Sequence, residues 1–211
     1  FTKAFKSRPI TRNLAGCWLV MIEINEDERD ALQEIMNISM GQAADALARL
    51  IQTKVSLSIP AIQAMSPEDF QGMINSLSNN WFARQSFTGT IRGEVIMSMH
   101  KDGCNALAQV MDFDLPLDEA ATEELVLEIT NILSAACLQG FTSQLELSTQ
   151  LNMPAFYYPV QSAHSNEWSS ILIIEVEFFI EQMQFDARIL IGLSEGSIEQ
   201  LLIPIKALLE D

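Results

Sequence analysis

The chain has 211 residues, of which 28 are acidic and only 12 are basic, so its formal net charge is −16 at pH 7. Nearly half of the residues (48%) are hydrophobic, a share that predicts a folded protein rather than a disordered one. No stripe of Lys and Arg exists, which argues against nucleic acids and anionic membranes as partners, and the acidic balance favours a partner that presents basic residues.

The first 21 residues differ from the rest and are expected to be an N-terminal extension of a single domain at 22–211. They carry four basic residues and no acidic one. The apolar run at 17–22 is far too short to span a bilayer and has no secretory cleavage site, so no membrane insertion is expected. Met21 is a candidate natural start, and this segment takes no part in the functional argument.

A long helix is expected from about residue 26 to residue 50, with acidic residues in its first turn that complement the helix dipole. At 100° per residue one face is apolar and contains Leu32, Ile35, Met36, Ala43, Ala46, Leu47 and Leu50. The opposite face starts polar and continues with small residues, namely Asp30, Glu34, Asn37, Gly41, Ala44 and Ala48. Small side chains beside an exposed Glu and Asn leave room for another protein, although this helix alone also fits a plain solvated face.

Four further elements are expected before the middle of the chain. They are a strand at 54–59 ended by Pro60, an irregular or weakly helical stretch at 61–85, a β-hairpin at 86–99 with its turn near 92–93, and a short amphipathic helix at 101–112. On the short helix, Leu107, Val110 and Met111 are expected to face inward. Residues 114–118 are the best candidate for a boundary between two halves.

A second long helix is expected from about residue 118 to residue 142. Its polar or small face contains Glu124, Glu128, Asn131, Ala135 and Thr142. Its apolar face contains Leu125, Val126, Ile129, Ile132, Leu133, Ala136 and Phe141. The remaining expected elements are strands at 145–151, about 155–161, 171–181 and 184–193, and a last helix at 197–209.

The two halves repeat one pattern at a distance of 94 residues. Each copy has an acidic residue, three residues, Glu, two residues, Asn, twenty-two residues and Pro: Asp30, Glu34, Asn37 and Pro60, then Glu124, Glu128, Asn131 and Pro154. The strands at 93–99 and 187–193 correspond at the same offset. The sequence therefore predicts an α+β fold, internally duplicated into halves at about 26–113 and 118–209, with pseudo-two-fold symmetry and two motif-bearing helices on a mainly antiparallel sheet.

Sequence motifs for several common chemistries are missing. The histidines, His100 and His164, are isolated, and no residues have the spacing of a zinc site. No P-loop or GxGxxG motif occurs, so nucleotide hydrolysis has no support, and a single GxSxG pattern stands at 192–196. The three cysteines (Cys17, Cys104 and Cys137) are expected to be reduced and mostly buried, as in a cytosolic protein.

What remains is Glu followed by Asn three residues later, used twice. Residues at this spacing lie about 5–6 Å apart on a helix surface, so Glu34 and Asn37 could address one ligand together. A neutral amide can donate to and accept from a water molecule, and a carboxylate can hold a lysine or take a proton. Neither group binds phosphate unaided, so a partner would have to supply the electrophile and any metal.

The repeated pattern resembles the signature of the CheC/CheX/FliY phosphatases of bacterial chemotaxis, which reads Asp or Ser, three residues, Glu, two residues, Asn, twenty-two residues, Pro. The first copy matches at every position, and the second departs only at Glu124. The segment at 37–43 is also similar to the Asn-Ile-Gly-x-Gly-Asn-Ala of CheC, with Ser39 and Gln42 as departures. The resemblance covers roughly residues 26–209 and implies a CheC-like fold.

The resemblance implies a phosphatase that hydrolyses the aspartyl phosphate of a response-regulator receiver domain, typically phosphorylated CheY. In that case Asn37 and Asn131 would orient the attacking water, and Glu34 and Glu128 would pair with the receiver's lysine. The chain would need no cofactor of its own, and Mg²⁺ would belong to the receiver. A cytoplasmic protein is expected, with a CheD-like deamidase as a further candidate partner and either a monomeric or a dimeric state.

Two other functions remain open from the sequence. One is a receiver-docking or flagellar-switch module that retains the motif but turns over little. The other is an adaptor in which the repeated Glu/Asn face is a helix–helix interface. Because Glu124 replaces the Asp or Ser of the signature, the pair Glu34/Asn37 is expected to be the stronger of the two sites.

Overall fold

The computed structural model describes residues 10–12, 18–20, 24–77, 79–158, 171–180 and 185–210. Expectations about Cys17, Met21, His164 and the end of the strand at 155–161 lie outside these residues. The elements are β1 (Ile10–Arg12), β2 (Trp18–Val20), α1 (Glu26–Ile51), β3 (Ser56–Leu57), β4 (Ala61–Met65), α2 (Pro67–Ser76), β5 (Asn80–Gly89), β6 (Gly93–His100), a 3-10 turn (Lys101–Gly103), α3 (Cys104–Val110), α4 (Glu119–Gln144), β7 (Thr149–Leu151), β8 (Ala155–Phe156), β9 (Ile171–Ile180), β10 (Phe185–Leu193) and α5 (Glu195–Glu210).

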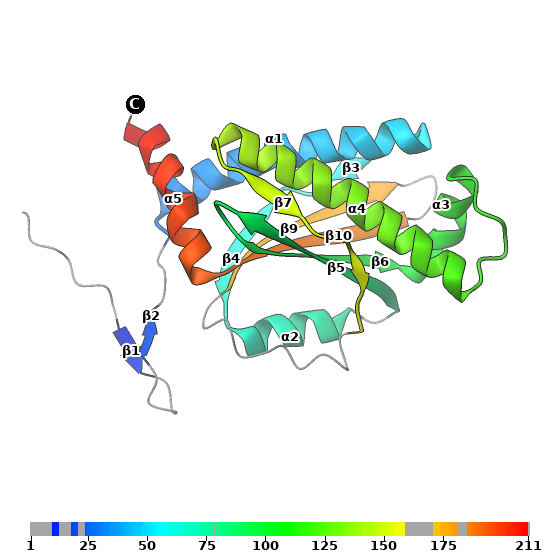
Figure 1. The fold of residues 1–211 in the computed structure, drawn as a ribbon, viewed down its shortest axis with the longest axis horizontal. Coiled ribbons are helices and arrows are strands. Elements are labelled where there is room, and N and C mark those ends of the chain that lie inside the picture. Colours follow the sequence, from blue (N-terminus) through cyan, green and yellow to red (C-terminus); the bar gives the residue numbers. More distant parts are fainter. Residues whose placement is uncertain are drawn as a thin grey trace, which may run out of the picture.

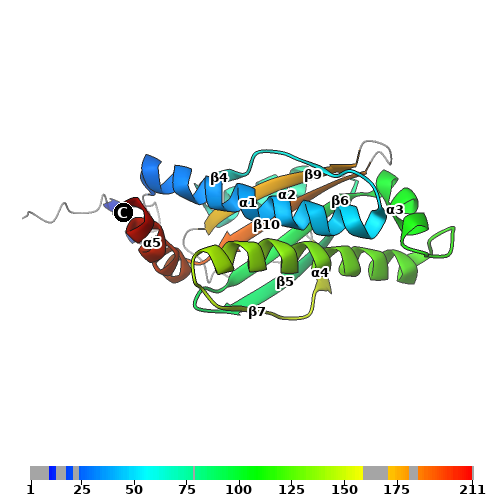
Figure 2. The same cartoon turned by 90° about the horizontal axis from the view of Figure 1, so that it is seen from above.

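An eight-stranded sheet lies between two helical layers, while β1 and β2 pair in a separate two-stranded sheet. Helices α1 and α4 cover one face of the large sheet and α2 covers the other (Figure 1). Seen from above, α1 and α4 lie side by side and run in opposite directions (Figure 2). The α+β class and the two long helices on an antiparallel sheet are confirmed.

The large sheet is shared by the two halves of the chain. Its order is β3-β9-β10-β6-β5-β7, with β4 also paired to β9 and β8 also paired to β5, and every pairing is antiparallel. At the centre Ile96 pairs with Leu190, and these two residues differ by the 94 positions of the repeat. The short edge strands of each half pair with the hairpin of the other half. The predicted pseudo-two-fold symmetry therefore extends to an exchange of strands.

Side-chain caps set the starts of the two long helices, which are 26 residues each. At α1, Asn25 Oδ1 accepts from the Glu28 amide (2.8 Å) and Glu28 Oε2 accepts from the Asn25 amide (3.1 Å), which is a capping box. At α4, Asp118 Oδ1 accepts from the Ala121 amide at 2.8 Å. Helix α1 ends where Gln52 adopts φ 52°, in the left-handed region. Both helices lie within two residues of their predicted bounds.

The predicted apolar faces are mostly buried, with four corrections. Leu50 is 40% exposed and Val110 is 38% exposed, whereas Ala44 and Thr142 are buried. Each long helix packs against its partner helix as well as against the sheet, so the buried arc is wider than one face of a helical wheel. At the last turn of α1, Ile51 takes the inward place that was predicted for Leu50.

The stretch at 61–85 is more regular than predicted. It contains β4, α2 and the start of β5, and α2 begins at a Ser66 cap followed by Pro67. Strands β3 and β7 are shorter than predicted, since β3 has two residues and α4 continues to Gln144 before β7 begins at Thr149. The hairpin of β5 and β6 is confirmed, and the predicted half boundary at 114–118 lies in the loop between α3 and α4.

Helix α4 is long and apolar enough to cross a membrane by length and composition alone. However, 61% of that apolar window is buried inside the fold, where α4 packs against α1 and β5. This placement is that of a core helix.

Cys104 and Cys137 are free and buried, as predicted for the structural thiols. Burial, together with the charge of Asp102, raises the pKa of Cys104 to about 11. Burial also raises the pKa of Cys137. Both thiols are therefore protonated at neutral pH, and the thiolate is the reactive form.

We expect neither thiol to react with an aromatic disulfide reagent at pH 8 in a folded Cys17→Ser variant. With a pKa of about 11, only roughly a thousandth of Cys104 is thiolate at that pH, and burial also blocks the reagent. Both thiols should react within minutes in guanidinium chloride, which provides the control. Rapid release of a full equivalent of dye from the folded protein would contradict the buried positions.

Candidate functional site

The structure places the two predicted Glu/Asn pairs at equivalent positions near the middle of the two long helices. Glu34 and Asn37 are exposed on α1, and Glu128 and Asn131 are exposed on α4. The two pairs are carried by helices that adjoin different strands, since α1 contacts β3 and β4 whereas α4 contacts β5, β7 and β8 (Figure 2). They form two separate candidate sites, called site one (α1) and site two (α4). The contact between α1 and α4 is made by other, buried residues.

Site two opens into a groove between α4 and the turn that follows β7. The groove has a volume of about 740 Å³, and Glu128 and Asn131 line its helical wall. Asn152, Met153 and Pro154 line the opposite wall. The twenty-two residues of the repeat thus bring the proline back beside the Glu/Asn pair, which explains why all three residues belong to one pattern.

A second hollow of about 520 Å³ adjoins this groove at the start of α4. Glu124 and Glu128 line both cavities, and Asp112, Asp114 and Asp118 line the second. Five carboxylates within one wall produce a negative potential that favours a positively charged group of a partner.

Close to site one, the two residues that depart from the CheC segment, Ser39 and Gln42, lie against the end of α4. Ser39 is buried, its hydroxyl donates to the Ile35 carbonyl (2.8 Å), and it accepts from Gln144 Nε2 (2.8 Å). An added Cβ at Gly140 would lie 2.7 Å from Gln42 Oε1. The departures at Ser39 and Gln42 therefore serve the close contact between the two helices.

Sequence reasoning missed two kinds of residue at these sites. Gln85 is 1% exposed, and its Nε2 donates to Asn131 Oδ1 at 3.0 Å. Ile59 (75% exposed) and Met153 (89% exposed) precede the proline in their respective halves and project apolar side chains. The repeat did contain a signal for Ile59 and Met153, because an apolar residue precedes the Pro in both copies. Gln85 gives no local signal, because it lies 46 residues from Asn131.

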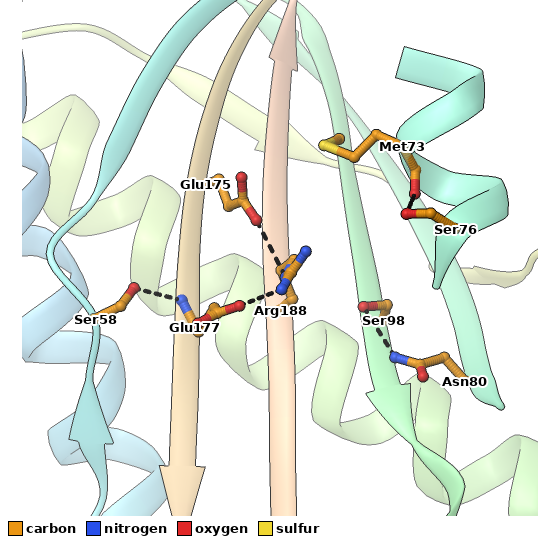
Figure 3. Close-up of polar contacts among 8 residues, drawn as sticks. All are labelled: Ser58, Met73, Ser76, Asn80, Ser98, Glu175, Glu177 and Arg188. Atoms are coloured by element: carbon orange, nitrogen blue, oxygen red, sulfur yellow. Dashed lines mark hydrogen bonds and ion pairs between the residues drawn. The ribbon is translucent and has the colours of Figure 1, made fainter. Parts of the chain in front are cut away.

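A separate polar cluster lies on the opposite face of the sheet, beneath α2. Arg188 forms ion pairs with Glu175 (3.1 Å) and Glu177, and Ser58 Oγ accepts from the Glu177 amide at 3.0 Å (Figure 3). The two carboxylates thus balance the positive charge of the Arg188 guanidinium on this face of the sheet. This face is not the one that carries the Glu/Asn pairs. Within the described parts of the chain, no group of three or more His, Cys, Asp or Glu is placed to hold a metal ion.

Two family models match separate parts of the chain. The model of the CheC-like family matches residues 28–63, which include Glu34, Asn37 and Pro60. The model of the chemotaxis phosphatase CheX matches residues 82–173, which include Glu128, Asn131 and Pro154. No curated protein matches the chain.

Several solved structures share the fold at low sequence identity. FliY of Thermotoga maritima has a TM-score of 0.67 at 14% identity, covering 88% of this chain and 99% of its own. CheX in a CheX–CheY–BeF3–Mg²⁺ complex from Borrelia burgdorferi has a TM-score of 0.53 at 16% identity, with 77% and 99% covered. A FliG–FliM complex from H. pylori matches with a TM-score of 0.63 at 10% identity, with 85% and 99% covered.

The fold of this chain is thus shared with proteins named FliY, CheX and FliM. The resemblance to the CheC/CheX/FliY family is confirmed by the CheC-like match at 28–63 and by the CheX match at 82–173, which begins in β5 of the first half and extends into the second half.

Proposed function

We propose that this protein is a phosphatase that hydrolyses the aspartyl phosphate of a CheY-like receiver domain. The observation that carries the proposal is the exposed Glu/Asn pair, repeated at the middle of two symmetry-related helices. The CheX family match and the fold of a CheX that was crystallised with CheY support it. Because such receivers act in the cytoplasm, the protein is proposed to act there.

In the proposed mechanism the receiver docks against α1 or α4 and brings its phosphorylated aspartate to the Asn side chain. The amide of Asn37 or Asn131 orients a water molecule for in-line attack on phosphorus. The carboxylate of Glu34 or Glu128 pairs with the receiver's lysine and fixes the docked geometry. Any Mg²⁺ would be held by the receiver, where it would neutralise charge at the phosphoryl group. The contribution of this chain is orientation and charge rather than a covalent intermediate.

The experiment that tests the proposal follows the decay of a ³²P-labelled receiver domain from the same genome. Substoichiometric protein should accelerate the decay over many turnovers. Unchanged decay for every receiver that binds the protein would reject the enzymatic function.

A second function, a receiver-docking or flagellar-switch module without turnover, is favoured by the structural neighbours. FliY and a FliM that was crystallised with FliG share this fold. Binding to a phosphorylated receiver without faster decay would support this alternative. A CheD-like deamidase remains an expected partner, to be tested by direct binding.

Replacing Glu34 and Glu128 together by Gln should weaken binding to the beryllofluoride-activated receiver by about tenfold or more. The change removes a charge-assisted contact to lysine while it preserves side-chain shape. Turnover at saturating receiver should change less than affinity. Calorimetric titration measures the difference, and Glu119→Gln, which removes one carboxylate at an exposed position in the first turn of α4, is the control for the loss of a surface charge elsewhere. Equal affinity of the double variant and the wild type would exclude the proposed lysine contact.

A further inference from the structure

Gln85 is a buried amide that joins the two walls of the site-two groove. It lies on the helix-facing side of β5, between the core residues Ala83 and Phe87. Its Nε2 donates to Asn131 Oδ1 at 3.0 Å and to the backbone carbonyl oxygen of Asn152 at 2.8 Å. One amide group therefore uses both of its protons to tie α4 to the turn before Pro154.

These contacts fix the orientation of two side-chain amides. A backbone carbonyl oxygen can only accept, so the group of Gln85 that faces Asn152 must be Nε2. The same Nε2 faces Asn131, so the facing atom of Asn131 must be its acceptor Oδ1. The Nδ2 group of Asn131, with both of its protons, is therefore left for the groove or for a bound water.

Packing alone does not account for a glutamine at this position. Among the described residues, Gln85 Oε1 is buried without a hydrogen-bond partner. A buried acceptor without a partner is destabilising, and an apolar side chain would avoid that cost. The fold thus tolerates the unpaired Oε1 of Gln85 while its Nε2 donates two hydrogen bonds.

The sheet beneath site one shows what stands at this position when the amide is absent. Gln85 pairs with Val95 in its hairpin, and Val176 pairs with Ile189, which is Val95 displaced by the repeat of 94. The neighbouring hydrogen bonds support this correspondence between Gln85 and Val176. The Asn152 amide donates to the carbonyl of Ser86, the residue after Gln85, and the Ser58 amide donates to the carbonyl of Glu177, the residue after Val176. Val176 is buried and cannot donate, and Asn37 has no side-chain hydrogen bond to any described residue. The two sites are therefore unequal in the support of their Asn.

We propose that Gln85 is a positioning residue that holds the Asn131 amide in its working orientation, and that site two is consequently pre-organised while site one is not. This inference rests on the proposed function, because it assigns Gln85 a part in the hydrolysis of an aspartyl phosphate. A pre-set amide needs no reorientation when the receiver docks, so the contribution appears in turnover more than in affinity. Site two is then the faster site, the reverse of the ranking suggested by Glu124.

The test compares Gln85→Met in two single-site backgrounds. Asn37→Ala leaves site two alone, and Asn131→Ala leaves site one alone. In the site-two background, Gln85→Met should lower kcat for phosphorylated receiver about tenfold, with KM changed less than twofold. The loss should be confined to that background. An equal loss in both backgrounds, or an unchanged kcat at site two, would overturn the proposal.

A second readout is independent of phosphatase activity. The side-chain amide resonances of Asn131 are assigned by their loss in Asn131→Asp. In full-length wild type they should differ from those of an exposed amide, and Gln85→Met should move them toward free-amide values while the backbone spectrum shows a folded protein. Unmoved resonances would reject the positioning role. If no receiver is hydrolysed by wild type, the proposed function fails, and positioning is decided by these resonances alone. Gln85→Leu repeats both measurements should Gln85→Met not fold.

Discussion

The double variant Asn37→Ala/Asn131→Ala should lose receiver-phosphatase activity, with a rate at least about 100-fold below that of the wild type. Each change removes the only side chain in its site that is proposed to aim the attacking water. Both residues are exposed on mid-helix positions, and Ala is a better helix former than Asn, so the fold should be retained. Binding to the activated receiver should stay within a few-fold of wild type, because the Glu residues are intact.

Decay of labelled receiver and calorimetric binding, measured on the same preparations, separate the two effects. Asn105→Ala, at an exposed position of α3, is the matched control and should behave as wild type in both assays. A double variant that dephosphorylates the receiver normally would remove the basis for both proposed active sites. Loss of binding together with activity would instead make the Asn face a docking surface.

Gly93→Ala should destabilise the protein by about 3 kcal/mol, because the new methyl group has no space. A Cβ at this position would lie 2.1 Å from the Gly192 carbonyl oxygen and 2.8 Å from Cζ of Phe87. Gly93 stands in the central pairing of β6 with β10, where both neighbours are fixed by the sheet. The clash could be relieved only by separating β6 from β10, the two strands through which the halves pair.

Denaturant unfolding followed by circular dichroism measures this loss. Gly72→Ala is the matched control, since an added Cβ there meets nothing within 4 Å and Gly72 lies inside α2. That substitution should stabilise the protein by about 0.5–1 kcal/mol, as Ala is the better helix former. Equal midpoints for the two variants would show that the central strands are not packed as described.

The sequence was informative wherever a signal is local. The acidic first turn placed the start of α1, and the predicted strands at 171–181 and 184–193 correspond to β9 and β10. The repeat predicted the pseudo-two-fold symmetry, because a strict offset of 94 cannot be maintained by unrelated elements. These features depend on neighbouring residues or on identity between the copies, both of which one sequence contains.

What remained hidden depends on contacts between distant segments. Leu50 was expected inside from its wheel position, but the packing of α1 against several elements selects Ile51 instead. Strand β4 carries little alternation of its own and is defined by its pairing with β9, more than a hundred residues later. Gln85 was unremarkable in sequence because its role comes from Asn131 and Asn152, which reach it only in the folded sheet.

The exchange of edge strands bears on how a chain of this kind can arise. A free half would expose a hairpin edge that only another copy could cover, so it would fold as an interlocked dimer whose stability rises with concentration. Joining the copies through the loop at 111–118 replaces that encounter by an intramolecular one with a high effective concentration. The fused protein is then free of the symmetry that a homodimer imposes, so one half can carry Val176 while the other carries Gln85.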